Sequence, residues 1–362
     1  MASILNPAAL TFSADQVRAI NELVVKAILK APDLNTMHTF VPGIKNDREI
    51  GVIPNTLGLI GKAAQGCGTR TPESNTVVAA LKKWEPKRLE ILLRQCYTDL
   101  ENSFLKFARR PGNEIYDLTS ASDVANAYVA FIIDILSIDI PKTILRHAWF
   151  GNTDAATVTD SPAGVLTAGI DPDYFNLIDG FWVQLATIYG SDPTRNTDIA
   201  ANAQATRALQ FSTFTPALAA AALNAVIDDA PATVQAQADR ILIATRSVTQ
   251  KAKRYLQASG MPYKVELQTN GMELMEWDGI PLITVPLFDE WIAAYENNGT
   301  KLNDPHRIVF TSKSNLNIGT EGSSLFSSID AYFDKVTKYN FIEAIDAFDA
   351  KILDDALVQV AR

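Results

Sequence analysis

The chain is poor in the residues that most often carry catalysis or bind metal ions. Its 362 residues include only two cysteines and three histidines. Cys67 and Cys96 form no CxxC pair, and two cysteines are too few for a structural zinc site or a disulfide scaffold. Both are expected to be free thiols. The histidines, His38, His147 and His306, are far apart and match no ligand spacing such as HExxH. We therefore expect neither a metal ion nor a cofactor.

The motifs of nucleotide-binding and hydrolytic enzymes are missing as well. The stretch GLIGK at residues 58–62 lacks the spacing of a phosphate loop, and Ala63 stands where that loop needs Ser or Thr. Gly66 and Gly68 do not extend to GxGxxG, because Thr71 occupies the third position. No serine lies in a GxSxG elbow. The sequence therefore does not predict an enzyme.

Long apolar runs are also absent. The most apolar stretch, Tyr128 to Ile138, is interrupted by Asp134 and is shorter than the roughly 18 residues that a membrane span needs. The first ten residues, MASILNPAAL, lack the basic region and apolar core of a secretory signal. These features predict a protein of cytoplasmic origin without membrane contact.

Positive charge is scarce overall but locally concentrated. The formal net charge of −9 argues against tight contact with nucleic acid. The segment from Gly43 to Gly112 nevertheless holds twelve Lys or Arg against seven Asp or Glu, a local charge of +5, so the rest of the chain carries −14. Solvated surface charge is one interpretation, and a basic projection that lies on an acidic neighbour is the other. The lysines and arginines around Trp84 form the one patch that favours a test for DNA contact.

The first third of the chain predicts a helix, an extended arm and a long β-hairpin. Ser13 and Gln16 form a capping-box pattern at the start of an amphipathic helix that Pro32 ends. Residues 36–47 have no clear period and are expected to form an extended arm. Apolar stretches at 50–60 and 76–84 flank a glycine cluster, and a third runs from Arg88 to Cys96. Because two strands cannot bury a face by themselves, this hairpin is expected to lie on something else.

Helical patterns dominate the middle of the chain. One helix is expected after Thr98 and ends at Pro111, and a longer one with a wide apolar stripe follows Ser120 and ends before Pro141. Residues 143–150 are expected to form a strand. Asp171 followed by Pro172 predicts the cap and first turn of a helix that closes at Gly190.

Residues 241–320 predict a small α+β unit. A buried strand at 241–245 leads to a helix that Ser247 caps and Gly260 terminates. Two strands then meet at a tight turn of Asp278 and Gly279, followed by a short helix that ends in aromatic residues, a loop and a further strand.

Four segments carry a resemblance to a known family: KKWEPKRLEILLRQCYTDLENSF after the hairpin, ILRHAWFGNTD after the long helix, WDGIPLITVPLFDEW with NDPHRIVFTSKSNLNIGT, and the acidic tail. In their order, the elements resemble the major capsid proteins of tailed bacteriophages, which have the Hong Kong 97 type of fold. The resemblance covers nearly the whole chain and depends on element order rather than on an invariant motif.

The resemblance implies an α+β fold with four parts. These are an N-terminal helix and arm at 1–46, an extended hairpin loop at 47–97, a peripheral domain with the long helix at 98–205 and 321–362, and an axial domain at 206–320. The resemblance also favours strands in the tail from Tyr339 to Val360, where apolar spacing alone fits a helix.

The implied function is that of a major capsid protein that assembles into hexamers and pentamers of an icosahedral shell around phage double-stranded DNA. The shell would be a virion capsid assembled in the bacterial host cytoplasm. Its partners would be other copies of itself and a portal protein, with scaffold or decoration proteins as further candidates and weak, non-specific contact with the packaged DNA. A basic hairpin is expected to add onto the acidic surface of another subunit. The candidate inter-subunit contact residues are Arg48, Lys62, Arg70, Lys82, Lys83 and Trp84.

Two alternatives remain open. A nanocompartment shell of the same fold, similar to encapsulins, would enclose an enzyme instead of DNA. A soluble enzyme would act through paired carboxylates such as Asp346 with Asp349, but a chain with 41 acidic residues forms such pairs by chance.

Overall fold

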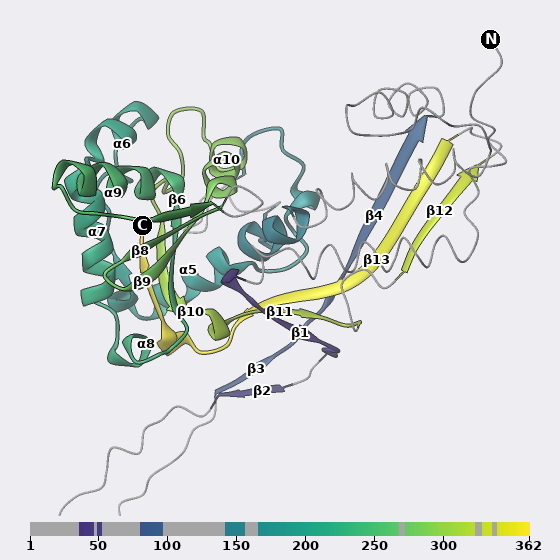
Figure 1. The fold of residues 1–362 in the computed structure, drawn as a ribbon. Helices are drawn as coiled ribbons and strands as arrows, with labels where there is room; N and C mark the ends of the chain where they lie inside the picture. The colour runs from purple at the N-terminus through teal and green to yellow at the C-terminus, as the bar shows by residue number, and fades with distance from the viewer. Residues whose placement is uncertain are drawn as a thin grey trace, which may run out of the picture.

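The computed structural model describes residues 36–46, 49–52, 80–96, 142–155, 166–267, 272–322, 328–334 and 339–362. The helices expected within 13–32, 98–111 and 120–141 lie outside these residues, as do the tip of the hairpin and Arg48, Lys62 and Arg70. Figure 1 shows a body of helices and strands from which two groups of strands extend in different directions.

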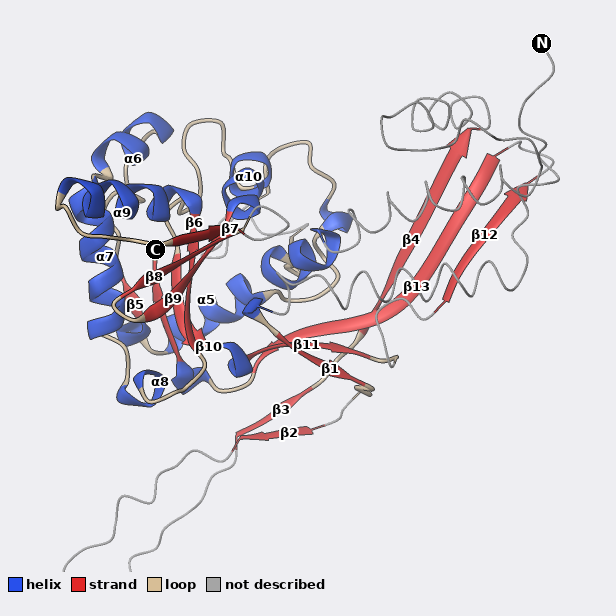
Figure 2. Cartoon of the chain, in the orientation of Figure 1, coloured by secondary structure: helices blue, strands red, loops and turns tan. Residues whose placement is uncertain are grey.

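A seven-stranded mixed sheet forms the centre of the body. Its strand order is β5 (Asn196–Thr197), β14 (Val358–Ala361), β10 (Ile308–Ser312), β6 (Arg240–Thr245), β9 (Ile280–Val285), β8 (Glu273–Trp277) and β7 (Val265–Leu267). The central strand β6 runs parallel to β9 and antiparallel to β10. Five of its six residues are buried, because helices cover both faces of the sheet, so the prediction of a buried strand at 241–245 is confirmed. Figure 2 shows these helices on both sides of the strands.

Alternate side chains of the sheet enter two separate cores. Leu242 and Phe310 pack on one face with α7 (Pro216–Asp228) and α9 (Arg246–Ala258). Ile243 and Val309 pack on the other face with α5 (Phe181–Ser191) and α10 (Pro286–Tyr295). This alternation follows from the two-residue period of a strand. The remaining helical elements are α6 (Arg207–Thr213), α8 (Ala232–Gln235), η3 (Pro172–Tyr174), η4 (Pro193–Arg195), η5 (Lys313–Asn315) and η6 (Asp355–Leu357).

The strand expected at 143–150 is wrong, since residues 142–150 are helical. Ile144, Leu145, Ala148 and Trp149 are all buried, and their spacing of three and four residues is that of one helix face.

The continuous helix expected after Asp171 is also wrong, because the chain forms the short η3 and then starts α5 after Gly180. Gly180 donates its N–H to the carbonyl oxygen of Gly151 at 2.9 Å. A Cβ added to Gly180 would lie 2.8 Å from the backbone nitrogen of Gly151 and 2.9 Å from the carbonyl oxygen of Ala148. This close backbone contact fixes the break between η3 and α5.

Two local turns are confirmed as predicted. Asp278 and Gly279 have φ angles of 49° and 72°, the left-handed pair that joins two strands in a two-residue hairpin. Gly260, with φ 68°, follows the end of α9. The start of that helix differs from the prediction: Ser247 lies inside α9, and the carboxylate of Asp289 on α10 accepts hydrogen bonds from the first two N–H groups of α9.

A second sheet leaves the body. It contains β1 (Thr39–Pro42), β11 (Leu316–Thr320), β13 (Tyr339–Ile352) and β12 (Ser328–Asp334) in that order, and β4 (Lys87–Cys96) also pairs with β13. The extended arm is thus confirmed for β1. The tail forms strands, as the resemblance implied, rather than the helix that its spacing fits. In Figure 1, β4, β13 and β12 extend together away from the body.

The predicted division into domains stays a prediction, but two strands cross its boundaries. β5 and β14 come from segments assigned to the peripheral domain, yet β14 pairs with β10 of the segment assigned to the axial domain, and β5 pairs with β14. The last residues of the chain therefore complete the seven-stranded sheet.

Candidate assembly site at the base of the hairpin

The base of the predicted hairpin is present as a two-stranded ribbon. β2 (Glu49–Val52) and β3 (Ala80–Lys83) are antiparallel, with pairs from Glu49 with Lys83 to Val52 with Ala80. The ribbon leaves the lower side of the body in Figure 1. The third apolar stretch does not extend it: β4 turns away and pairs with β13 over ten residues.

Trp84 fixes the end of the ribbon to its own subunit. Its side chain is only 3% exposed. It lies over Gly319 of β11, where an added Cβ would be 2.9 Å from the Trp84 ring and 2.8 Å from two side-chain carbons of Ile44. Gly319 is therefore needed at this position because the indole and Ile44 occupy the space of a side chain.

Asp349 of β13 forms a hydrogen bond with the backbone of Glu85, the residue after Trp84. Its carboxylate accepts hydrogen bonds from the N–H groups of Glu85 and Ala350, both at 2.8 Å, and lies 3.6 Å from the ammonium nitrogen of Lys351. Burial raises the pKa of this carboxyl above its usual range, and the nearby Lys351 charge and the two N–H groups oppose that shift.

Lys82 connects the ribbon to the end of β13 and to η6. Its ammonium group donates to the carbonyl oxygen of Ile352 at 2.6 Å and to the carboxylate of Asp355 at 2.5 Å. We call the contacts of Lys82, Trp84 and the Glu85 N–H with β11, β13 and η6 the hairpin anchor.

The anchor changes the interpretation of two predicted residues. Lys82 and Trp84 contact their own subunit. Lys83 is exposed. Arg48, Lys62 and Arg70 lie outside the described residues. A role of the six residues between subunits stays a prediction. Sequence reasoning missed Gly319, and it named Asp349 only as one of a pair of carboxylates and not as the acceptor for the Glu85 N–H. The pairing of β11 with β13 brings both residues to the ribbon.

The three histidines lie in separate, buried surroundings. His38 accepts a hydrogen bond from the indole N–H of Trp149 at 2.9 Å. His306 contacts the hydroxyl of Ser247 at 2.8 Å, and burial lowers its pKa to about 4. Burial and the neighbouring Arg146 likewise lower the pKa of His147 to about 4. No group of three or more His, Cys, Asp or Glu side chains within the described ranges is placed to hold a metal ion.

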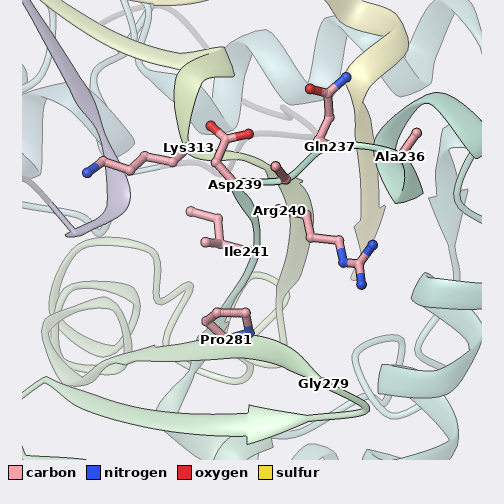
Figure 3. A pocket seen from close by; sticks show the side chains of 9 residues that line it. Ala236, Gln237, Asp239, Arg240, Ile241, Gly279, Pro281 and Lys313 are labelled. Carbon is pink, nitrogen blue, oxygen red and sulfur yellow. The ribbon is translucent and has the colours of Figure 1, made fainter.

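A hollow of about 400 Å³ beside the start of β6 shows no convergence of reactive groups (Figure 3). The carboxylate of Asp239 accepts from the N–H of Ser314 at 2.8 Å, and the guanidinium of Arg240 donates to the carbonyl oxygen of Gln235 at 2.5 Å. In Figure 3 the side chains of Lys313 and Arg240 point in opposite directions from Asp239. The hollow therefore has no arrangement for acid–base chemistry.

Among the described helices, no single one is long and apolar enough to span a membrane; α6 and α7 satisfy that criterion only as a pair, across a bend of 80°.

Comparison with known proteins gives matches of structure and not of sequence. No family model and no curated protein matches the chain. The satellite phage P4 procapsid, which includes a size determination (Sid) protein, matches with a TM-score of 0.51 at 14% identity, covering 94% of this chain and 98% of that chain.

Two further matches have lower TM-scores. A structure of Gordonia phage Cozz matches with a TM-score of 0.48 at 12% identity, covering 91% of this chain and 86% of that chain. The SrpI encapsulin of Synechococcus elongatus matches at 0.44 and 11% identity, covering 90% and 84%. The match to the P4 procapsid structure covers nearly all of both chains. The two sheets and the base of the hairpin described above agree with it. The chain thus has the α+β fold of the capsid proteins of the Hong Kong 97 type.

Proposed function

We propose that the protein is the major capsid protein of a tailed phage and that it assembles into the hexamers and pentamers of an icosahedral shell around double-stranded DNA. The observation that carries the proposal is the hairpin anchor: the ribbon is fixed at one end to its own subunit and projects from the body.

An anchored ribbon is suited to bind a second copy. A two-stranded sheet is at best marginally stable in water, so it gains stability by lying on another surface. Trp84 and Asp349 fix the place where it leaves the body, which limits the conformational entropy lost when it docks. A contact between two different surfaces of identical chains continues from copy to copy, and it closes into a ring or shell when the geometry allows.

Charge supports the same proposal. The segment that contains the ribbon carries +5 within a chain of net charge −9, so a neighbouring copy offers an acidic surface. The same acidic balance favours weak, non-specific contact with enclosed DNA. Portal, scaffold and decoration proteins would be partners of the assembled shell, which would form in the host cytoplasm and act in the virion as a non-enzymatic container.

Electron microscopy of the purified protein tests the proposal. The wild-type chain should form closed particles, and raising the salt concentration should weaken assembly because the contact is electrostatic. The triple variant Arg48→Glu, Lys62→Glu and Arg70→Glu should remain unassembled. A matched variant that keeps every charge, Arg48→Lys, Lys62→Arg and Arg70→Lys, should assemble normally.

Normal shells from the charge-reversed variant would show that the ribbon does not dock through its charge. A wild-type chain that stays monomeric would contradict the whole proposal. Nuclease-protected DNA inside particles from the native source identifies a virion, whereas an enclosed enzyme identifies a nanocompartment of the same fold.

A further inference from the structure

A second hollow, of about 540 Å³, opens where α7 and α9 both end and β8 turns into β9. Leu256, Met261 and Trp277 give it an apolar wall. Its charged groups are the carboxylates of Asp228, Glu276 and Asp278, and none of its ten lining residues is a lysine, arginine or histidine. A binding partner that complements this hollow would therefore present positively charged side chains next to apolar ones.

The apolar wall continues onto the edge of the sheet. Met261 is 53% exposed, and Tyr263 and Val265 are 37% and 36% exposed. These residues lead into β7, the edge strand of the seven-stranded sheet as far as the chain is described. Large apolar side chains gathered at an edge strand are typical of a surface that binds another protein.

The opposite end of α7 and α9, where both helices begin, carries exposed positive charges and exposed leucines. Phe214, just before α7, stacks on His306 with ring centroids 3.9 Å apart, and His306 contacts Ser247 in the first turn of α9. The starts of both helices therefore lie together, about 20 Å from their ends by the rise of α7. The side chain of Gln210 on α6 donates to the carbonyl oxygen of Leu302, which brings α6 to this end as well.

This end carries exposed cations and exposed leucines. Arg207 and Lys301 are exposed, and the N–H of Arg207 donates to the carbonyl oxygen of Thr300 at 3.0 Å, so the two charges lie on neighbouring segments. Leu209 is 44% and Leu218 is 49% exposed.

The carboxylates of the adjoining loop are already paired. Glu296 forms a buried ion pair with Arg307, and Asp304 accepts from Arg362 at 2.9 Å. These two carboxylates thus have other cations as partners than Arg207 and Lys301, which add positive charge to this end.

From these two surfaces we infer that the acidic hollow of one subunit receives the basic end of a second copy, formed by α6 and residues 300–301. The inference rests on the proposed self-assembly and adds a second contact beside that of the ribbon. The two surfaces lie at opposite ends of one body, so each copy can receive one neighbour and bind another. Such head-to-tail contacts repeat around a ring.

Charge reversal with rescue tests this contact. The hollow variant carries Asp228→Lys with Glu276→Lys, and the end variant carries Arg207→Glu with Lys301→Glu. All four side chains are exposed, so the fold is expected to persist, as thermal unfolding would verify. Each variant alone should raise the protein concentration needed for half-assembly by more than about tenfold, because like charges then face each other. The chain with all four changes should assemble near the wild-type concentration, and variants that keep each charge, such as Asp228→Glu and Lys301→Arg, should behave as wild type.

The outcomes separate this contact from the proposed function. If wild type assembles and either reversed variant assembles equally well, the hollow and the basic end do not meet. Loss of assembly in each reversed variant without rescue in the combined one would also overturn the pairing. A wild type that forms no particles at any concentration would overturn both the contact and the function.

Discussion

Acidification should destabilise the fold in part through His306, and replacing this residue should remove its share of that sensitivity. His306 is fully buried and stacks on Phe214. Its Nε2 lies 3.1 Å from the carbonyl oxygen of Gln210, so Nε2 donates there and Nδ1 accepts from the hydroxyl of Ser247. Burial, with a smaller contribution from the charge of Lys251, lowers the pKa of the imidazole to about 4.

The sign follows from proton binding. In the unfolded chain the imidazole has its ordinary pKa of 6.5, so between pH 6.5 and about 4 the unfolded state binds more protons than the folded state. Stability therefore falls as the pH falls through this window. One pKa unit corresponds to about 1.4 kcal/mol, so this group alone lowers the free energy of unfolding by about 2 to 3 kcal/mol between pH 7.5 and 4.5.

Urea unfolding at a series of pH values measures this effect in wild type and His306→Gln. The variant is expected to be less stable at pH 7.5, but to lose about 2 to 3 kcal/mol less than wild type on acidification to pH 4.5. Equal losses in the two proteins would refute the assigned environment of His306.

Asp289 provides a control of opposite sign. Burial raises its pKa to about 6, so its contribution favours the folded state as the pH falls from about 6 to its ordinary 3.8. The variant Asp289→Asn should therefore lose more stability than wild type on acidification.

Three further predictions concern the hairpin anchor. Gly319→Ala should destabilise the fold by about 1 to 3 kcal/mol in thermal unfolding, because its Cβ would lie 2.8 Å from Ile44; an unchanged melting temperature would contradict this packing. Asp349→Ala should cost about 1 to 3 kcal/mol, because it leaves the Glu85 N–H without its acceptor, and should speed hydrogen exchange at that amide. Lys82→Ala should change the free energy of unfolding by less than about 1 kcal/mol, because its carboxylate partner is more than half exposed; a larger loss in chemical denaturation would show that the link is stronger than a surface ion pair.

The sequence predicted those elements whose signals are local. The turn at Asp278 and Gly279, the strand β6 and the end of α9 at Gly260 each depend on a few adjacent residues, and all three are confirmed. The break before α5 depends on contact between Gly151 and Gly180, which no local pattern displays.

The candidate site was only partly predictable for the same reason. The basic cluster around Trp84 is visible in the sequence, and the structure places Lys82 and Lys83 at the base of the ribbon, whereas Lys87 and Arg88 lie in β4. The burial of Trp84 depends on Gly319, and the bond to Glu85 depends on Asp349. Both partners come from the far end of the chain and reach the ribbon only through the pairing of β11 with β13.

The long strand β13 has a mechanical consequence. Its 14 residues span roughly 45 Å, and Figure 1 shows it bending where it leaves the body. At the inner end of β13, the side chain of Gln184 on α5 forms hydrogen bonds with the backbone of Ala350 and Ile352. The outer part of β13 pairs with β4 on one side and β12 on the other. Tension along the strand would load many of these backbone bonds at once, in shear rather than one after another. The strand is thus suited to transmit force from its outer end to the body, because its register with β4 and β12 is held by many hydrogen bonds in parallel.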